Sequence, residues 1–108
     1  DINWRRRSGE MRTLEKVVSA IKRNEEVIKK KFKVREIGIF GSIVRGEETE
    51  KSDIDIIVEF ESDGKNFDNY MELKFFLEEL LGVSVDLVSK SAIKERLKAK
   101  ILEEVVYV

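Results

Sequence analysis

Ten residues separate a Gly-Ser pair, Gly41-Ser42, from an Asp-x-Asp triplet formed by Asp53 and Asp55. A small pair at the end of a strand lets backbone N–H groups approach a phosphate, because glycine has no Cβ to obstruct the ligand. Two carboxylates at positions i and i+2 of a strand point to the same face. They repel each other unless a cation lies between them. The combined pattern is typical of a site for a metal-bound triphosphate.

A third carboxylate, Asp86, lies within an alternating apolar segment at residues 83–88. A carboxylate between apolar neighbours needs a partner or access to solvent. If this segment forms a strand beside the one that carries Asp53 and Asp55, the three carboxylates converge, and divalent cations are needed to keep them ionised. Two ions about 3.5–4 Å apart would clamp the attacking and leaving oxygens of a phosphoryl or nucleotidyl transfer. Asp53 and Asp55 would hold the metals, while Asp86 would complete the metal shell and orient or deprotonate the attacking hydroxyl.

Gly41 and Ser42 have a matching role on the phosphate side of this hypothetical site. Backbone N–H groups of a short helix after Gly41, together with the Ser42 hydroxyl, can hold the β- and γ-phosphates. Arg45 either neutralises phosphate charge or pairs with Glu47 or Glu48 on the surface, and both alternatives stay open. Each motif alone has a simpler structural explanation, as a turn or as charge at a sheet edge. Their order and spacing together favour the functional interpretation.

The composition excludes several kinds of chemistry. The 108 residues include no cysteine and no histidine, which removes disulfides, thiol catalysis, thiolate zinc sites and Ser-His-Asp triads. Catalysis must therefore use carboxylates, Lys, Arg, hydroxyls or a bound metal. Oxygen ligands of this kind favour Mg²⁺ or Mn²⁺.

The charge distribution indicates a small soluble domain. Charged residues make up 40% of the chain, yet the net charge is −1, so no strong nucleic-acid binding is expected. The sequence has no apolar run of 18 residues, so it predicts no membrane span. The Arg-rich first residues lack the apolar core of a secretory signal, and we therefore expect the protein in the cytoplasm. We predict a disordered extension at residues 1–10 and one domain at residues 11–108. Abundant Lys and Glu without Gln resemble thermophile composition.

Helical periodicity appears in two long segments. Residues 11–33 carry apolar side chains at helical spacing, with Thr13 as the expected N-cap. Phe67–Leu81 repeat the pattern, and Gly82 is the expected glycine at the helix end. Phe75 lies off the main apolar stripe of that helix and is expected in the core, with an interface as the alternative.

Three shorter segments read as strands, at residues 34–40, 53–60 and 83–88. We expect a short helical turn at residues 42–46 and a polar loop at residues 47–52. Ser91 is the predicted cap of a last helix, whose apolar residues are Ile93, Leu97 and Ile101. The apolar end, residues 101–108, docks on the core, continues as a short strand or meets a partner. This order predicts an α/β (α+β) fold, a small mixed sheet flanked by helices.

At this point the motifs resemble those of a known family. The segments GSIVRG at residues 41–46 and SDIDIIV at residues 52–58 resemble the nucleotidyltransferase signature of the DNA polymerase β superfamily. More narrowly, the chain resembles the minimal nucleotidyltransferase (MNT) domain over residues 12–108, including the closing ILEEVVY at residues 101–107. The one minor departure is Val44, where a small alanine is common.

The resemblance implies transfer of a nucleoside monophosphate that depends on Mg²⁺, with two ions. It assigns metal binding to Asp53 and Asp55, the third carboxylate to Asp86, and triphosphate binding to Gly41 and Ser42. Members of the family often act as antitoxins that transfer AMP from ATP to a tyrosine of a HEPN ribonuclease toxin. Because this chain lacks histidine, it cannot carry the ribonuclease motif of the toxin itself.

Two alternatives to a protein-adenylylating antitoxin remain open. The chain could neutralise its partner by occlusion alone, with weak or vestigial catalysis, although a complete set of three acids argues against this. It could instead act on a small molecule, but such acceptors need a deep pocket, and this chain offers little sequence to build one. Because nothing here is long enough to grip an acceptor, we expect the acceptor site to be shared with a partner or a second copy.

Overall fold

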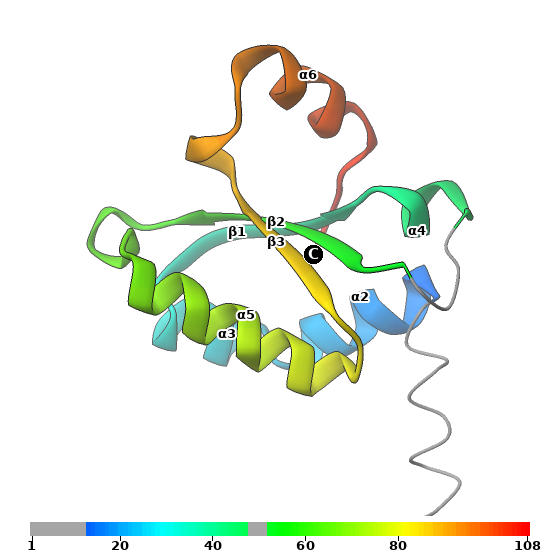
Figure 1. Cartoon of the computed structure of the whole chain (residues 1–108). Coiled ribbons are helices and arrows are strands. Elements are labelled where there is room, and N and C mark those ends of the chain that lie inside the picture. Colours follow the sequence, from blue (N-terminus) through cyan, green and yellow to red (C-terminus); the bar gives the residue numbers. More distant parts are fainter. Residues whose placement is uncertain (1–12, 48–51) are drawn as a thin grey trace, which may run out of the picture.

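The computed structural model describes residues 13–47 and 52–108 (Figure 1). The predicted extension at residues 1–10 and most of the predicted loop at residues 47–52 lie outside these ranges. The helices of the described part are α2 (Leu14–Arg23), α3 (Glu25–Lys31), α4 (Ser42–Arg45), α5 (Phe67–Leu81) and α6 (Glu95–Glu104). The strands are β1 (Val34–Phe40), β2 (Ile54–Phe60), β3 (Val85–Ser89) and β4 (Val106–Tyr107), and two 3₁₀ turns are η2 (Ser62–Gly64) and η3 (Lys90–Ala92).

The four strands form one mixed sheet in the order β3-β2-β1-β4. β1 pairs antiparallel with both β2 and β4, whereas β2 and β3 are parallel. A parallel pair needs a crossover, and α5 supplies it. The α2, α3 and α5 helices cover one face of the sheet, while η3 and α6 arch over the other (Figure 1). This arrangement confirms the predicted small mixed sheet flanked by helices.

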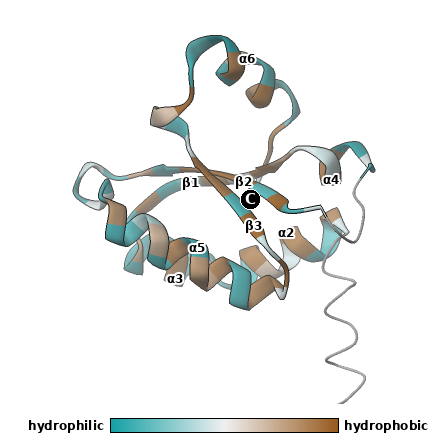
Figure 2. Cartoon of the chain, in the orientation of Figure 1, coloured by the Kyte–Doolittle hydropathy of each residue, from teal (hydrophilic) through white to brown (hydrophobic). Residues whose placement is uncertain are grey.

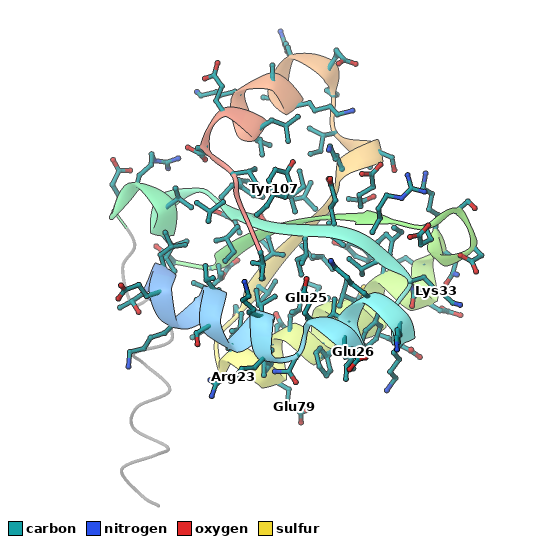
Figure 3. All side chains as sticks on the ribbon, turned by 180° about the vertical axis from the view of Figure 1, so that it is seen from behind. Arg23, Glu25, Glu26, Lys33, Glu79 and Tyr107 are labelled. Atoms are coloured by element: carbon teal, nitrogen blue, oxygen red, sulfur yellow. The ribbon has the colours of Figure 1, made fainter. Side chains whose placement is uncertain are left out.

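The hydrophobic core lies between the sheet and the helical layer. Alternate residues of β2, from Ile54 to Phe60, point into this layer and are at most 4% exposed. From α5, Leu73, Leu77 and Leu81 meet them and are fully buried. Figure 2 shows how hydrophobic residues follow the strands, and Figure 3 shows charged side chains such as Glu79 on the outer surface of the helices. The strict period of β2 leaves its other residues, Asp55 among them, on the α6 side.

The single helix predicted at residues 11–33 is instead two helices that meet at Asn24. Its N-terminus is as expected, since the Thr13 hydroxyl accepts a hydrogen bond from the Lys16 N–H. The Asn24 side chain donates to the Ala20 carbonyl oxygen at 2.9 Å. Asparagine competes in this way with the backbone hydrogen bonds of a helix, which explains the break.

The prediction for the last helix was wrong at its N-terminus. Ser91 does not cap it, because residues Lys90–Ala92 form the 3₁₀ turn η3 and α6 begins only at Glu95, after Lys94. The helix buries none of its side chains, and Leu97 is 50% exposed. Apolar spacing predicted the helix but carried no information on how deeply its side chains are buried.

The apolar end of the chain becomes part of the fold. Val106 and Tyr107 form β4 against β1, and Val108 packs against the core. This confirms both the short strand and the docking on the core that residues 101–108 suggested. Phe75, by contrast, was expected in the core and is 57% exposed. Among the described residues, no helix combines the length and the apolar character needed to cross a membrane.

Candidate functional site

Asp55 lies at the point where three strands come together. In the parallel pair of β2 and β3 its register partner is Asp86, and in the antiparallel pair of β1 and β2 its partner is Phe40. Asp53 immediately precedes β2. Asp55 is partly buried, whereas Asp53 and Asp86 are exposed. The two central carboxylates therefore sit side by side on the sheet face that α6 overlies, as neighbouring strands were expected to place them.

Gly41 follows Phe40 and fits directly against Asp55. Its φ angle is +86°, which disfavours any residue with a Cβ. A Cβ built at Gly41 would lie 2.0 Å from Asp55 Oδ2 and 2.8 Å from its Cγ. The space that a side chain would need is thus occupied by the Asp55 carboxylate. The glycine of the first motif is required by the carboxylate of the second, a reason that sequence spacing alone does not reveal.

The surroundings of Asp55 make its ionised form costly. Burial, the negative charge of Asp86 and a hydrogen bond with it, and the charge of Asp53 raise the pKa of Asp55 to about 6, while Arg45 acts in the opposite direction. Without a compensating positive charge, Asp55 therefore ionises only as the pH rises through about 6. The pair is therefore suited to holding a cation or to exchanging a proton near neutral pH.

The chemistry of these donors fits a divalent cation. Carboxylate oxygens are the ligands that Mg²⁺ prefers, and such an ion would offset both the burial of Asp55 and the negative charges of Asp86 and Asp53, which together raise the Asp55 pKa. Across residues 13–47 and 52–108, however, no three acidic side chains surround a common point as a finished metal site would have them. The fold brings Asp55 and Asp86 together, while Asp53 acts on them through its charge from the start of β2.

Arg45 has two carboxylate partners at the end of α4. Its Nε donates to Glu47 Oε1 at 3.0 Å, and its Nη1 donates to both oxygens of Glu104 at 3.0 and 3.1 Å. These hydrogen bonds raise the pKa of Arg45 above its usual value. The pairing with Glu47 is one of the two alternatives that the sequence left open. Ser42, the other residue expected to bind phosphate, begins α4 and is partly exposed.

Glu104 was missed by the sequence analysis. Besides Arg45, it also accepts a hydrogen bond from the Gly41 backbone N–H, at 2.8 Å to Oε2. It is the last residue of α6 and stands 63 positions away from Gly41 in the sequence. No local spacing rule connects residues so far apart. Only the position of Glu104 within the closing ILEEVVY segment set it apart from the other surface glutamates.

Comparisons with known proteins agree with this geometry. Residues 21–108 match the Nucleotidyltransferase domain family, so the chain belongs to that family and is a nucleotidyltransferase. This range contains the whole Gly41-to-Asp86 site. The family membership confirms the resemblance read from the two motifs.

Individual relatives narrow the class further. The protein adenylyltransferase MntA of Thermococcus cleftensis is 47% identical over 98 residues, which cover 91% of this chain and 98% of the relative. A solved structure provisionally described as a minimal nucleotidyltransferase superimposes with a TM-score of 0.76 at 34% identity, covering 87% of this chain and 94% of that one. A toxin–antitoxin complex solved with AMP-PNP gives a TM-score of 0.63 at 26% identity, over 86% of this chain and 69% of that one.

Proposed function

We propose that this nucleotidyltransferase transfers AMP from ATP to a tyrosine of a HEPN-type toxin and acts as the antitoxin in that pair. The observation that carries the proposal is the register of Asp55 opposite Asp86, with Gly41 against Asp55. It is supported by the similarity to a protein adenylyltransferase and to a toxin–antitoxin complex that holds an ATP analogue.

We assign two roles to the carboxylates, binding the metal and accepting the proton of the attacking hydroxyl. Asp53, Asp55 and Asp86 would hold Mg²⁺, with two ions as the expected number. When bound, the metal would neutralise the charge of the triphosphate and of the three carboxylates. Asp86, which is exposed on β3, would accept the proton of the incoming hydroxyl. The raised pKa of Asp55 is the expected property of a carboxylate that functions with a cation beside it.

The phosphate groups are assigned to the end of β1 and to α4. The Gly41 N–H, the Ser42 hydroxyl and the Arg45 guanidinium would bind the β- and γ-phosphates. The tyrosine oxygen would then attack the α-phosphorus, and the bond from that phosphorus to the bridging oxygen would break. Pyrophosphate leaves with the bonding electron pair, and the phenolic proton passes to the Asp86 carboxylate. AMP ends on the tyrosine oxygen, so atoms and charge balance.

A protein acceptor fits the open side of the sheet. In the described part of the chain, η3 and α6 are the elements above the site, and α6 has no buried side chain (Figure 1). Because every side chain of α6 stays at least partly exposed, this helix leaves surface that a partner could cover. A protein partner that covers this face would supply both the enclosure and the hydroxyl.

The test is transfer of label from ATP. We would mix the protein with Mg²⁺, ATP labelled on the α-phosphate and the product of the neighbouring gene, using wild type, Asp53→Asn and Asp55→Asn. The matched control is Asp63→Asn, which removes an aspartate from the η2 turn, where its contact is an exposed ion pair with Lys33. We expect both site variants to lose transfer by at least about a hundredfold, because a lost metal ligand costs several kcal/mol of transition-state stabilisation.

Each other result has a defined meaning. Undiminished transfer by folded Asp53→Asn and Asp55→Asn would show that these carboxylates are not the catalytic centre. Absence of label on the partner, with a stable complex still forming, would replace the proposal with neutralisation by occlusion. Label on a small molecule and not on the partner would indicate a different transferase.

A further inference from the structure

The Glu104 carboxylate accepts hydrogen bonds from the same groups that the proposed function assigns to a phosphate. Its carboxylate accepts from the Gly41 N–H at 2.8 Å and from Arg45 Nη1 at 3.0 and 3.1 Å. Its side chain is only 26% exposed. Both donors are groups that we assign to the triphosphate, and a phosphate oxygen accepts the same kind of hydrogen bond as a carboxylate oxygen.

We propose that Glu104 is a built-in substitute for phosphate, which occupies the Gly41 and Arg45 donors in the nucleotide-free protein and is displaced when ATP binds. This inference rests on the proposed function, since it assumes that the site takes a triphosphate. The chemistry that displaces Glu104 is that of a polyphosphate with its divalent cation. Glu104 is therefore a regulatory residue of the site, which opposes nucleotide binding and contributes no group to the reaction.

Two physical reasons make coexistence unfavourable. The Gly41 N–H is a single donor, so it cannot serve Glu104 and a phosphate at full strength at once. The charges also conflict, because Arg45 already faces the two carboxylates of Glu47 and Glu104. A triphosphate added beside these acids would meet strong like-charge repulsion unless one of them withdraws.

The elements around Glu104 permit such a withdrawal. Glu104 ends α6, in which no side chain is fully buried, so the Glu104 side chain can turn away without a core side chain moving. It is followed by β4, which pairs with β1 over only two residues. The core contacts of the helical layer lie on the other face of the sheet and need not change. Displacement of Glu104 by ATP would also shift the end of α6. A partner that binds over this face would contact α6, so its binding would depend on whether ATP is bound.

The experiment measures binding without turnover. Wild type, Glu104→Gln and Glu103→Gln are titrated calorimetrically with α,β-methylene ATP in the presence of Mg²⁺. The carbon bridge between the α- and β-phosphorus atoms of this analogue prevents AMP transfer. Glu103→Gln is the matched control, because it removes the same charge from the neighbouring, exposed residue. We expect Glu104→Gln to bind about tenfold more tightly, the change that corresponds to one competing charge-assisted hydrogen bond, while the Glu103→Gln affinity changes by less than about twofold.

A second variant protects the test against a folding defect. Glu104→Asp keeps the charge but shortens the side chain by one methylene, so it should reach Gly41 poorly and tighten binding by less than Glu104→Gln. Equal or weaker binding in the folded Glu104 variants, with wild type binding normally, would overturn the displacement and leave the proposed function standing. If neither wild type nor any variant binds the analogue, both the displacement and the proposed function fail.

Discussion

Gly41 and Asp55 share one small volume between β1 and β2. The positive φ of Gly41 and the Asp55 carboxylate that fills its Cβ position make the two residues interdependent. Gly46 offers a natural comparison, because its φ of +75° is similar but a Cβ there would meet no atom within 4 Å. Gly46→Ala therefore measures the cost of a left-handed backbone alone, whereas Gly41→Ala combines its own backbone strain, at a ψ of −155°, with the displacement of Asp55.

We predict that Gly41→Ala is much more destabilising than Gly46→Ala. At Gly46, whose ψ of 23° gives a left-handed helical backbone, an alanine costs about 1–2 kcal/mol. At Gly41 the ψ of −155° gives a backbone conformation that essentially only glycine adopts, so an alanine there costs at least as much. At Gly41 the displacement of Asp55 adds to this cost, for a total of about 3 kcal/mol or more. Urea denaturation of both variants measures the difference. If the two variants lost the same stability, Asp55 would be able to make room for a Cβ at position 41 without cost, which would contradict the prediction.

The pKa of Asp55, raised to about 6, has a defined effect on stability. The unfolded value is about 3.9, so the folded protein binds the proton more tightly than the unfolded chain does. The protonated Asp55 therefore contributes to the free energy of unfolding; this contribution is complete below pH 4 and is lost as the pH rises through 6. Above pH 6 the ionised Asp55 destabilises the metal-free protein.

Asp55→Asn should therefore stabilise the metal-free protein at pH 8 by about 1–2 kcal/mol, a value reduced to allow for solvent screening. The gain should shrink as the pH falls and be absent at pH 4. Denaturation in the presence of a chelator at both pH values gives the comparison. Asp63→Asn, in the exposed ion pair with Lys33, is the control and should show no comparable gain. A stability difference that did not vary with pH would contradict the raised pKa.

At the scale of elements, one asparagine joins three segments of the helical layer. The Asn69 side chain donates to the Phe32 carbonyl oxygen at 2.7 Å and to the Gly64 carbonyl oxygen at 2.9 Å. It thus connects α5 to the end of α3 and to η2. Sequence reasoning did not single it out, because an asparagine near a helix start has many simpler roles.

We predict that Asn69→Ala lowers the free energy of unfolding by about 2 kcal/mol, since it leaves two partly buried carbonyl groups without this donor. Asp68→Ala, one residue away and exposed, removes a favourable charge at the start of α5 and should cost about 0.5 kcal/mol. AMP transfer per folded molecule should be unchanged in Asn69→Ala, because Asn69 lies on the helical side of the sheet. A stability loss no greater than that of Asp68→Ala would contradict the bridging role.

The same scale shows why some elements were predictable and others were not. The bounds of α5 follow from its apolar period and from Gly82, which adopts the expected left-handed conformation. The break at Asn24 had a signal that was overlooked, a polar residue on the buried stripe between Ile21 and Ile28. Local spacing gave no signal for the start of α6. The η3 turn before it begins at Lys90, which forms ion pairs with Glu36 of β1 and Glu59 of β2, and such distant contacts cannot be read from neighbouring residues.

At the scale of the whole molecule, the sheet divides the chain into two layers of different character. Helices α2, α3 and α5 bury a continuous apolar core on one face, while the other carries Asp55 and Asp86 beneath η3 and α6, and α6 has no fully buried side chain (Figure 1). The sequence predicted the acids and their common face from the two-residue period of strands. It could not predict the Glu104 contact, which depends on how the chain returns to β1 after α6.

The central claim is that this face transfers AMP, and paired labels test it most directly. The protein, Mg²⁺ and the proposed HEPN-type partner would be incubated with ATP labelled on either the α- or the γ-phosphate. We predict that the α label appears on a tyrosine of the partner, while the γ label is released in pyrophosphate. Covalent γ label on the partner would show phosphoryl transfer, and neither label on the partner would show that it is not the acceptor; either result would contradict the claim.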